Sequence, residues 1–150
     1  MNNKSTLLFS ISLLITLSLL FYACGNGSPD IVDEDLPLPQ KIDRLIEVND
    51  YETALSLLSG QDREDPEIRL LLEKTHLNYG LHSMNTFDQT EMRTRMNNAL
   101  TQFTEVLKIN PENRVARDQI EQIMAIYATI PNRQPEPDVL EGLREVGFDY

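Results

Sequence analysis

The sequence predicts an all-α fold, and three observations support this class. Between residues 41 and 130 the chain contains only two prolines, Pro66 and Pro111, and two glycines, Gly60 and Gly80. Apolar side chains in this segment recur every three to four residues, the spacing that gives a helix one buried face. No stretch of it alternates apolar and polar residues long enough to predict a half-buried strand. We therefore expect helices packed through their apolar faces.

Residues 1–23 have the pattern of a secretory signal peptide. Lys4 is the only charged residue before Cys24, and residues 5–23 form an apolar run, as in signal peptides. The end of this run, Ala23-Cys24-Gly25, resembles the lipobox of bacterial lipoproteins. The resemblance implies that Cys24 is lipidated and becomes the mature N-terminus. An uncleaved transmembrane anchor is one alternative, since about 19 apolar residues can just span a bilayer core. A helix buried in the protein core is another.

Residues 24–39 are rich in glycine, proline and acidic side chains, a composition typical of flexible tethers. The acidic run of residues 33–35 is repelled by anionic lipid, which favours separation of the folded part from the membrane. Either a lipid anchor or an uncleaved span places the rest of the chain outside the cytoplasm. We expect it to be attached to the cell membrane or an outer membrane.

Both internal prolines lie in sequences that favour the start of a helix. Asp65-Pro66-Glu67 and Asn110-Pro111-Glu112 each supply a capping side chain, a proline suited to the first turn, and an acid near the positive end of the helix dipole. Gly60 suits the end of the preceding helix. The sequence therefore predicts helix boundaries at these positions.

The spacing before these prolines repeats, and residues 40–130 resemble the tetratricopeptide repeat. Four residues match the second helix of that unit, and three match it in an earlier copy. The matches are Ala99, Phe103, Val106 and Pro111, and Ala54, Leu58 and Pro66. The resemblance implies a short array of helix-turn-helix units.

The second helical hairpin is expected to be longer than in a standard repeat. Ala54 and Ala99 are 45 residues apart, compared with about 34 in the standard unit. The excess is close to three helical turns, or about 10.8 residues, which keeps the apolar face in register. We predict helices over Glu67–Met84 and Asp88–Ile109 with a tight turn at residues 85–87; a flexible loop is the alternative.

Residues 131–150 are predicted to form a linker and a short C-terminal helix. Prolines between residues 131 and 137 interrupt the preceding helix, and residues 138–146 place their apolar side chains on one face before Gly147. This helix would cover the exposed end of the array. The alternative is a mobile tail.

Composition and motifs argue against several classes of function. The net charge of −11, from 13 basic and 24 acidic side chains, repels nucleic acids. His76 and His82 are six residues apart, which does not place two metal ligands on one helical face. The sequence has no glycine-rich phosphate loop and no nucleophile elbow. We therefore expect no enzyme activity, no metal and no cofactor.

The repeat resemblance implies a partner-binding face made by the first helices of successive units. The positions that it assigns to this face are Leu70, Glu73, Leu77 and Gly80, followed by Val115, Asp118, Gln122 and Ala125. The version of the repeat that binds peptide carboxylates needs basic side chains and asparagine there. Glu73 and Asp118 occupy the face instead, so the expected protein partner is apolar or basic. Met84, Met92 and Met96 either add an adaptable contact patch or fill the hairpin interior.

Together these features predict a membrane-anchored, extracytoplasmic adaptor or envelope assembly factor that binds a protein. Analogy with repeat lipoproteins of envelope machines supports this interpretation. A ligand- or peptide-binding lipoprotein subunit of a transport system is the alternative. An open groove with exposed apolar residues favours the first function, whereas a buried pocket that holds carboxylates with perturbed pKa values favours the second function or an enzyme.

Overall fold

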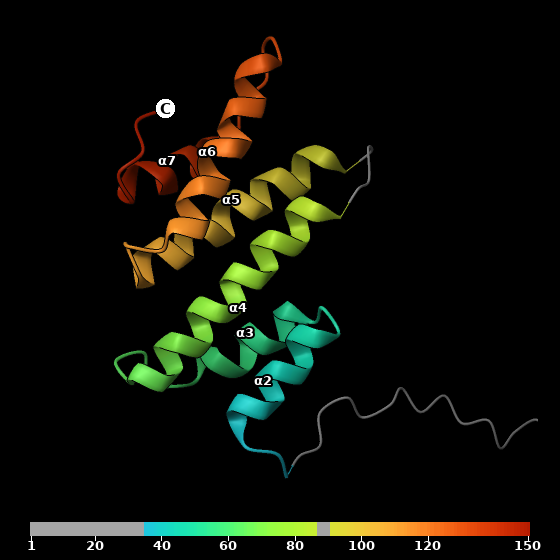
Figure 1. The fold of residues 1–150 in the computed structure, drawn as a ribbon, viewed down its shortest axis with the longest axis vertical. Helices are drawn as coiled ribbons and strands as arrows, with labels where there is room; N and C mark the ends of the chain where they lie inside the picture. The colour runs from blue at the N-terminus through green and yellow to red at the C-terminus, as the bar shows by residue number, and fades with distance from the viewer. Residues whose placement is uncertain (1–34, 87–90) are drawn as a thin grey trace, which may run out of the picture. The chain divides into compact units, whose positions relative to one another are not determined.

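The computed structural model describes residues 35–86 and 91–150, and all the regular structure in these ranges is α-helical (Figure 1). The predicted all-α class is therefore confirmed for this part of the chain. Its helices are α2 (Leu38–Glu47), α3 (Tyr51–Ser59), α4 (Pro66–Asn85), α5 (Met92–Ile109), α6 (Arg114–Thr129) and α7 (Pro137–Glu145). The predicted signal peptide, Cys24 and most of the predicted tether lie outside the described residues.

A sharp turn joins α2 to α3. Asn49 has a positive φ of 62°, a conformation that asparagine adopts more readily than most residues. The Asp50 N–H donates to the carbonyl of Leu45 at 2.8 Å, while Oδ1 of Asp50 accepts from the Thr53 N–H at 3.3 Å. Asp50 therefore closes one helix and caps the next, which brings both against α4.

The predicted long hairpin is present as α4 and α5. The expected helix over Glu67–Met84 extends one residue further at each end, and the next helix is observed from Met92 to Ile109. Asp65 caps α4 as predicted, since its Oδ1 accepts from the Glu67 N–H at 2.8 Å. The predicted turn includes Asn85 and Thr86, which end α4, and a residue outside the described ranges.

One predicted helix start is wrong. The Asn110-Pro111-Glu112 segment forms a turn, and α6 begins at Arg114 with Asn113 as its cap. Oδ1 of Asn110 accepts from the Glu112 N–H at 3.2 Å, a local turn that competes with helix formation. Oδ1 of Asn113 accepts from the Ala116 N–H at 3.0 Å and completes the cap.

Buried side chains form two clusters along these helices. The first cluster joins α2 and α3 to the beginning of α4 and contains Ile42, Leu45, Ala54, Leu58, Ile68, Leu71 and Leu72. The second cluster centres on α5 and includes Ala99, Leu100, Phe103, Val106, Leu107, Ile120, Ile123 and Leu143. Tyr51 of α3 also stacks on Tyr79 of α4, with ring centroids 4.9 Å apart. Helix α4 therefore takes part in packing on both of its sides.

The C-terminal helix is confirmed, and it packs against α5. Leu143 of α7 is fully buried. Gly147 has a φ of +92°, and the Phe148 N–H donates to the carbonyl of Leu143 at 3.0 Å; this arrangement is a Schellman motif. Residues 137–148 are therefore held on α5, in place of the alternative mobile tail.

The close approach of α4 and α5 at Gly80 leads to a stability prediction. A Cβ atom at Gly80 would lie 2.6 Å from Cε1 of Phe103, a fully buried ring. We expect Gly80→Ala to destabilise the fold by up to about 2 kcal/mol, because overpacking of about 1–3 kcal/mol opposes a gain in helix propensity of about 1 kcal/mol. Urea unfolding followed by circular dichroism measures the change.

Gly60→Ala is the matched control, because nothing lies within 4 Å of the added Cβ atom and the backbone is α-helical. That variant should be neutral or more stable by up to about 1 kcal/mol. A Gly80→Ala protein that is as stable as Gly60→Ala would contradict the close packing.

Candidate functional site

The four predicted face residues of α4 have different environments. Leu70 is 65% exposed, as the prediction requires. Leu77 is partly buried and packs against the cluster around α5. Gly80 is buried under Phe103, so its assignment to an open face is wrong. Packing of α4 against both α3 and α5 turns the middle of the helix inward, and the repeat pattern alone does not reveal this.

Glu73 connects two parts of the fold. Its Oε1 accepts hydrogen bonds from Nδ2 of Asn110 and from Nδ2 of Asn113, both at 2.8 Å. These asparagines bracket the turn between α5 and α6, and Asn113 also caps α6. Glu73 therefore positions the start of α6 relative to α4. Its Oε1 atom is already engaged by two hydrogen bonds within the protein.

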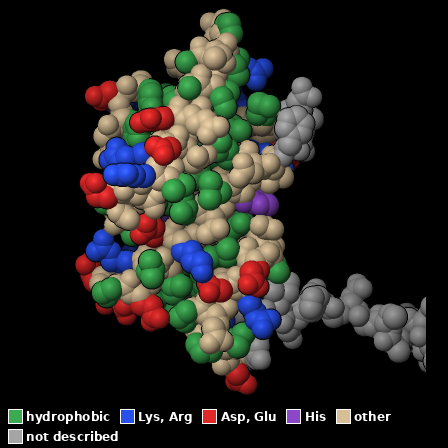
Figure 2. All heavy atoms as spheres, in the orientation of Figure 1, with side chains coloured by type: hydrophobic (Ala, Val, Ile, Leu, Met, Phe, Trp, Pro, Cys, Tyr) green, Lys and Arg blue, Asp and Glu red, His purple; other side chains and the backbone are tan. Residues whose placement is uncertain are grey.

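The predicted face residues of α6 are all exposed. Val115 is 46% exposed, and Asp118, Gln122 and Ala125 are also exposed to solvent. The opposite side of α6, which includes Ile120 and Ile123, is fully buried against the cluster around α5. Of the predicted face, the structure thus leaves Leu70 and the α6 residues available to a partner. Figure 2 shows apolar side chains between charged ones on one face of the molecule.

Two cavities flank the second half of α6. The first, which we call the α5–α6 groove, has a volume of about 340 Å³ and is lined by Met92, Met96, Ile126 and Tyr127 among others. The second, which we call the α6–α7 groove, has a volume of about 1240 Å³ and includes Met124, Tyr127 and Leu140. Both grooves are open to solvent.

Three arginines line the larger groove, and the sequence analysis did not identify them. Arg93 belongs to α5, Arg133 to the α6–α7 connection and Arg144 to α7. They are far apart in the sequence and belong to no motif, so no sequence signal groups them. Only the packing of α6 and α7 on α5 brings them to one cavity.

The methionines have mixed roles. Met84 and Met96 pack against the cluster around α5, which agrees with filling of the hairpin interior. Met92 is 40% exposed and lines the α5–α6 groove together with Met96. Packing in the hairpin interior thus describes Met84 and Met96, whereas Met92 is exposed as a contact patch requires.

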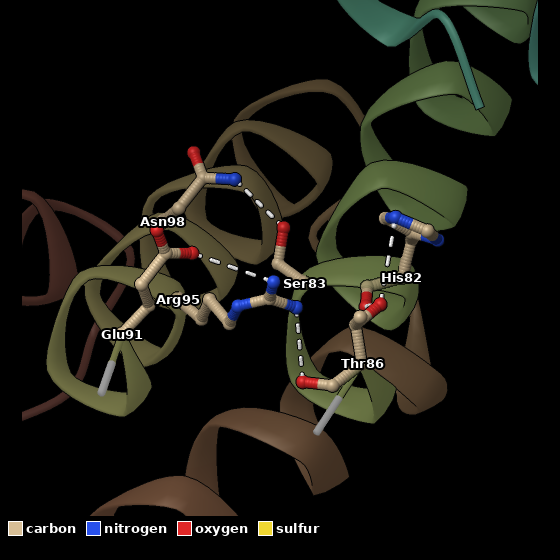
Figure 3. Close-up of polar contacts among 6 residues, drawn as sticks. All are labelled: His82, Ser83, Thr86, Glu91, Arg95 and Asn98. Carbon is tan, nitrogen blue, oxygen red and sulfur yellow. Dashed lines mark hydrogen bonds and ion pairs between the residues drawn. The ribbon is translucent and has the colours of Figure 1, made fainter. Parts of the chain in front are cut away.

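A polar cluster holds the ends of α4 and α5 together (Figure 3). Arg95 donates from Nη1 to the Thr86 carbonyl at 3.0 Å and pairs with Glu91 at 3.4 Å. Asn98 donates from Nδ2 to Oγ of Ser83 at 2.8 Å. These contacts join the two helices, and we assign the cluster a structural role.

A third cavity, of about 320 Å³, contains His76 and charges of both signs. Nδ1 of His76 donates to Oε1 of Gln102 at 2.7 Å. Burial lowers the pKa of His76, and the hydrogen bond to Gln102 and the nearby Glu105 carboxylate act in the opposite direction. Lys108 of this cavity is already paired with Glu105 and Glu145, at 2.9 and 3.1 Å. Its pKa is raised, most strongly by the hydrogen bond to Glu105.

In the part of the chain that the structure describes, no group of three or more His, Cys, Asp or Glu side chains is placed to hold a metal ion. Within the same part, no helix combines the length and apolar content needed to cross a membrane. Comparison with models of known families, with curated proteins and with solved structures found no match to this chain.

The two hydrogen bonds of Glu73 lead to a second stability prediction. We expect Glu73→Ala to destabilise the fold by about 1–3 kcal/mol, because two partly buried amide groups lose their acceptor. Glu73→Gln keeps an acceptor oxygen and should lose less. Urea unfolding measures the stability, and hydrogen exchange of the amide groups in the first turn of α6 measures the local effect.

Glu112→Ala removes an exposed carboxylate from the same turn and is the matched control. Faster exchange at the start of α6 is expected for Glu73→Ala alone. Equal exchange in the two variants would show that Glu73 does not position α6.

Proposed function

We propose that this protein is a lipid-anchored, extracytoplasmic adaptor or envelope assembly factor that binds another protein and performs no chemistry itself. The apolar run that ends at Cys24 supports the anchor, with residues 24–39 as a tether to the helical part. This anchor attaches the protein to the cell membrane or to an outer membrane. Lipid attachment at Cys24 leaves residues 35–150 free to meet a partner.

The helical part supports a protein-binding role through its resemblance to the tetratricopeptide repeat. Ala99, Phe103 and Val106, which carry the resemblance, are fully buried in α5, as the second helix of such a unit requires. Contacts of α4 with α2 and α3 are also compatible with successive helix pairs. We propose that α2 to α6 form a short tetratricopeptide-like array, with α7 as its cover.

The observation that carries the proposal is the exposure of apolar side chains on α4 and α6, together with the open grooves beside α6. Leu70 and Val115 are large apolar side chains in solvent, and both grooves beside α6 are open. Surfaces of this kind are typical of sites that bind protein segments. Leu70, Val115, Asp118 and Gln122 are the residues we propose for partner contact, with Glu73 as their support and Leu77 in the packing beneath.

A ligand- or peptide-binding subunit of a transport system is the second candidate. The size of the α5–α6 groove supports it, because a volume of about 340 Å³ is within the range of small-molecule sites, whereas the openness of the groove supports the adaptor. A partner captured through Leu70 and Val115 would support the adaptor, whereas a small molecule that copurifies with the protein would support this alternative.

The membrane anchor can be tested at its cysteine. In the native bacterial host, we expect Cys24→Ser to abolish metabolic labelling with a fatty-acid analogue and to release the protein from membranes, because the thiol is the proposed attachment point. Labelling and membrane fractionation by immunoblot measure both effects. A Ser28→Ala protein is the control and should behave like wild type. A Cys24→Ser protein that remains labelled would show that the lipid is attached elsewhere.

The partner-binding face can be tested by crosslinking in intact cells. We expect a Leu70→Asp, Val115→Asp double variant to lose a specific crosslinked partner by roughly tenfold or more, because charges replace exposed apolar contacts. The matched control is Val48→Asp, Leu57→Asp, which changes two exposed apolar residues, one at the C-cap of α2 and one in α3. Equal capture by both double variants would contradict the proposed face.

A further inference from the structure

The α6–α7 groove is built by two helices that share one support. Helices α6 and α7 both pack against α5, and residues 130–136 connect them. Met124 and Leu140, one from each helix, are partly buried and contact the same core cluster. The groove between them has a volume of about 1240 Å³, which exceeds the usual range of small-molecule sites, about 300–1,000 Å³.

The charge of this groove is opposite to the charge of the whole chain. Arg93, Arg133 and Arg144 line it together with a single acid, Glu121, although the chain carries 24 acidic and 13 basic side chains. Among the described residues, none of these three guanidinium groups makes a hydrogen bond or an ion pair.

Two of the three basic side chains that line the His76 cavity, Arg63 being the third, provide a contrast. Lys108 is paired with two carboxylates, and Arg69 donates to the Ile109 carbonyl at 2.9 Å. The α6–α7 groove thus differs in presenting several cations whose hydrogen-bonding capacity is unused within the described structure.

Tyr127 adds an independent observation. Its side chain lines both grooves beside α6, and the residue is only 8% exposed. The buried hydroxyl has no hydrogen-bond partner in the described part of the chain. Burial raises the pKa of Tyr127, so the phenol is protonated at neutral pH and is able to donate to an oxygen.

We propose that the α6–α7 groove binds an acidic polypeptide segment that also carries large apolar side chains. Arg93, Arg133 and Arg144 hold the carboxylates, with which guanidinium groups form paired hydrogen bonds. Met124 and Leu140 contact the apolar side chains, and Tyr127 donates to an oxygen of the segment.

A protein segment satisfies this surface better than other anionic ligands. The net charge of −11 repels extended polyanions such as nucleic acid and anionic membrane surfaces, whereas a short segment meets only the local positive charge. Apolar residues between the arginines require apolar groups on the ligand.

This inference rests on the proposed protein-binding function and names the chemistry of a partner segment. It differs from the apolar or basic partner that Glu73 and Asp118 predict, because it concerns the groove beside the second half of α6, which meets the predicted face at Ala125. A partner that contacts both surfaces would place acidic groups between α6 and α7 and apolar or basic groups near Leu70 and Val115.

Selection of random peptides tests the inference. The full-length chain in detergent is presented to a phage library of peptides of about 12 residues, which in extended form span roughly 40 Å. The groove variant is Arg93→Glu, Arg133→Glu, Arg144→Glu. The control variant is Arg44→Glu, Arg63→Glu, Arg114→Glu, which changes the net charge equally at exposed arginines outside the groove. Circular dichroism establishes that both variants are folded.

We expect wild type and the control variant to enrich peptides with acidic and large apolar residues. The affinity of the best peptide should fall by roughly tenfold or more in the groove variant and by about fivefold in Tyr127→Phe. Tyr127→Phe removes only the hydroxyl and is expected to fold normally.

Three outcomes would overturn the assignment. They are selection of peptides without acidic residues, no enrichment of any peptide by wild type, and equal affinity of the best peptide for the groove and control variants. Stronger binding to anionic vesicles or to RNA than to the selected peptides would also overturn it. If the groove variant still captures the crosslinked partner in cells while the Leu70, Val115 variant does not, the adaptor function stands and only the groove assignment fails. If wild type captures no specific partner in cells, the proposed function itself fails.

Discussion

The packing of α5 against its neighbours is the constraint on which the rest of the structure depends. Helix α5 contacts α4, α6 and α7, and Phe103 is fully buried at its centre. The absence of a side chain at Gly80 lets α4 approach the Phe103 ring. Since protein interiors are densely packed and adapt poorly to added volume, this contact sets the spacing of the long hairpin. Helices α6 and α7 pack against the faces of α5 that α4 leaves open.

Polar contacts determine where α6 starts. The Glu73 carboxylate holds Asn110 and Asn113 at the turn after α5, and Asn113 begins α6 by capping it. This arrangement moves the helix start three residues beyond the position that Asn110-Pro111 predicts. The start of α6 is therefore held by a carboxylate that the sequence pattern assigned to partner contact.

Open surfaces and unused cations mark the two places where we propose binding. Leu70 of α4 and Val115 of α6 present apolar area, whereas Arg93, Arg133 and Arg144 present positive charge to the groove beside the second half of α6. Salt screens interactions between exposed charges over roughly 8–10 Å. A ligand in the groove would therefore be attracted by the nearby arginines and little affected by acidic side chains farther away, despite the negative net charge of the chain. The proposed adaptor would thus distinguish partners by an apolar surface of α4 and α6 and by a basic groove between α6 and α7.

The sequence by itself determined the helical class and most helix boundaries. Apolar spacing, Asp65-Pro66 and Gly147 act through neighbours a few residues away, so local physics is sufficient to predict them. The candidate site was predictable only in part: Leu70, Val115, Asp118 and Gln122 are exposed as expected, but Leu77 and Gly80 are turned inward. Tertiary packing decided the inward position of Gly80, the role of Glu73 and the meeting of three arginines from α5, the α6–α7 connection and α7. These features depend on contacts between residues distant in sequence, which no local pattern encodes.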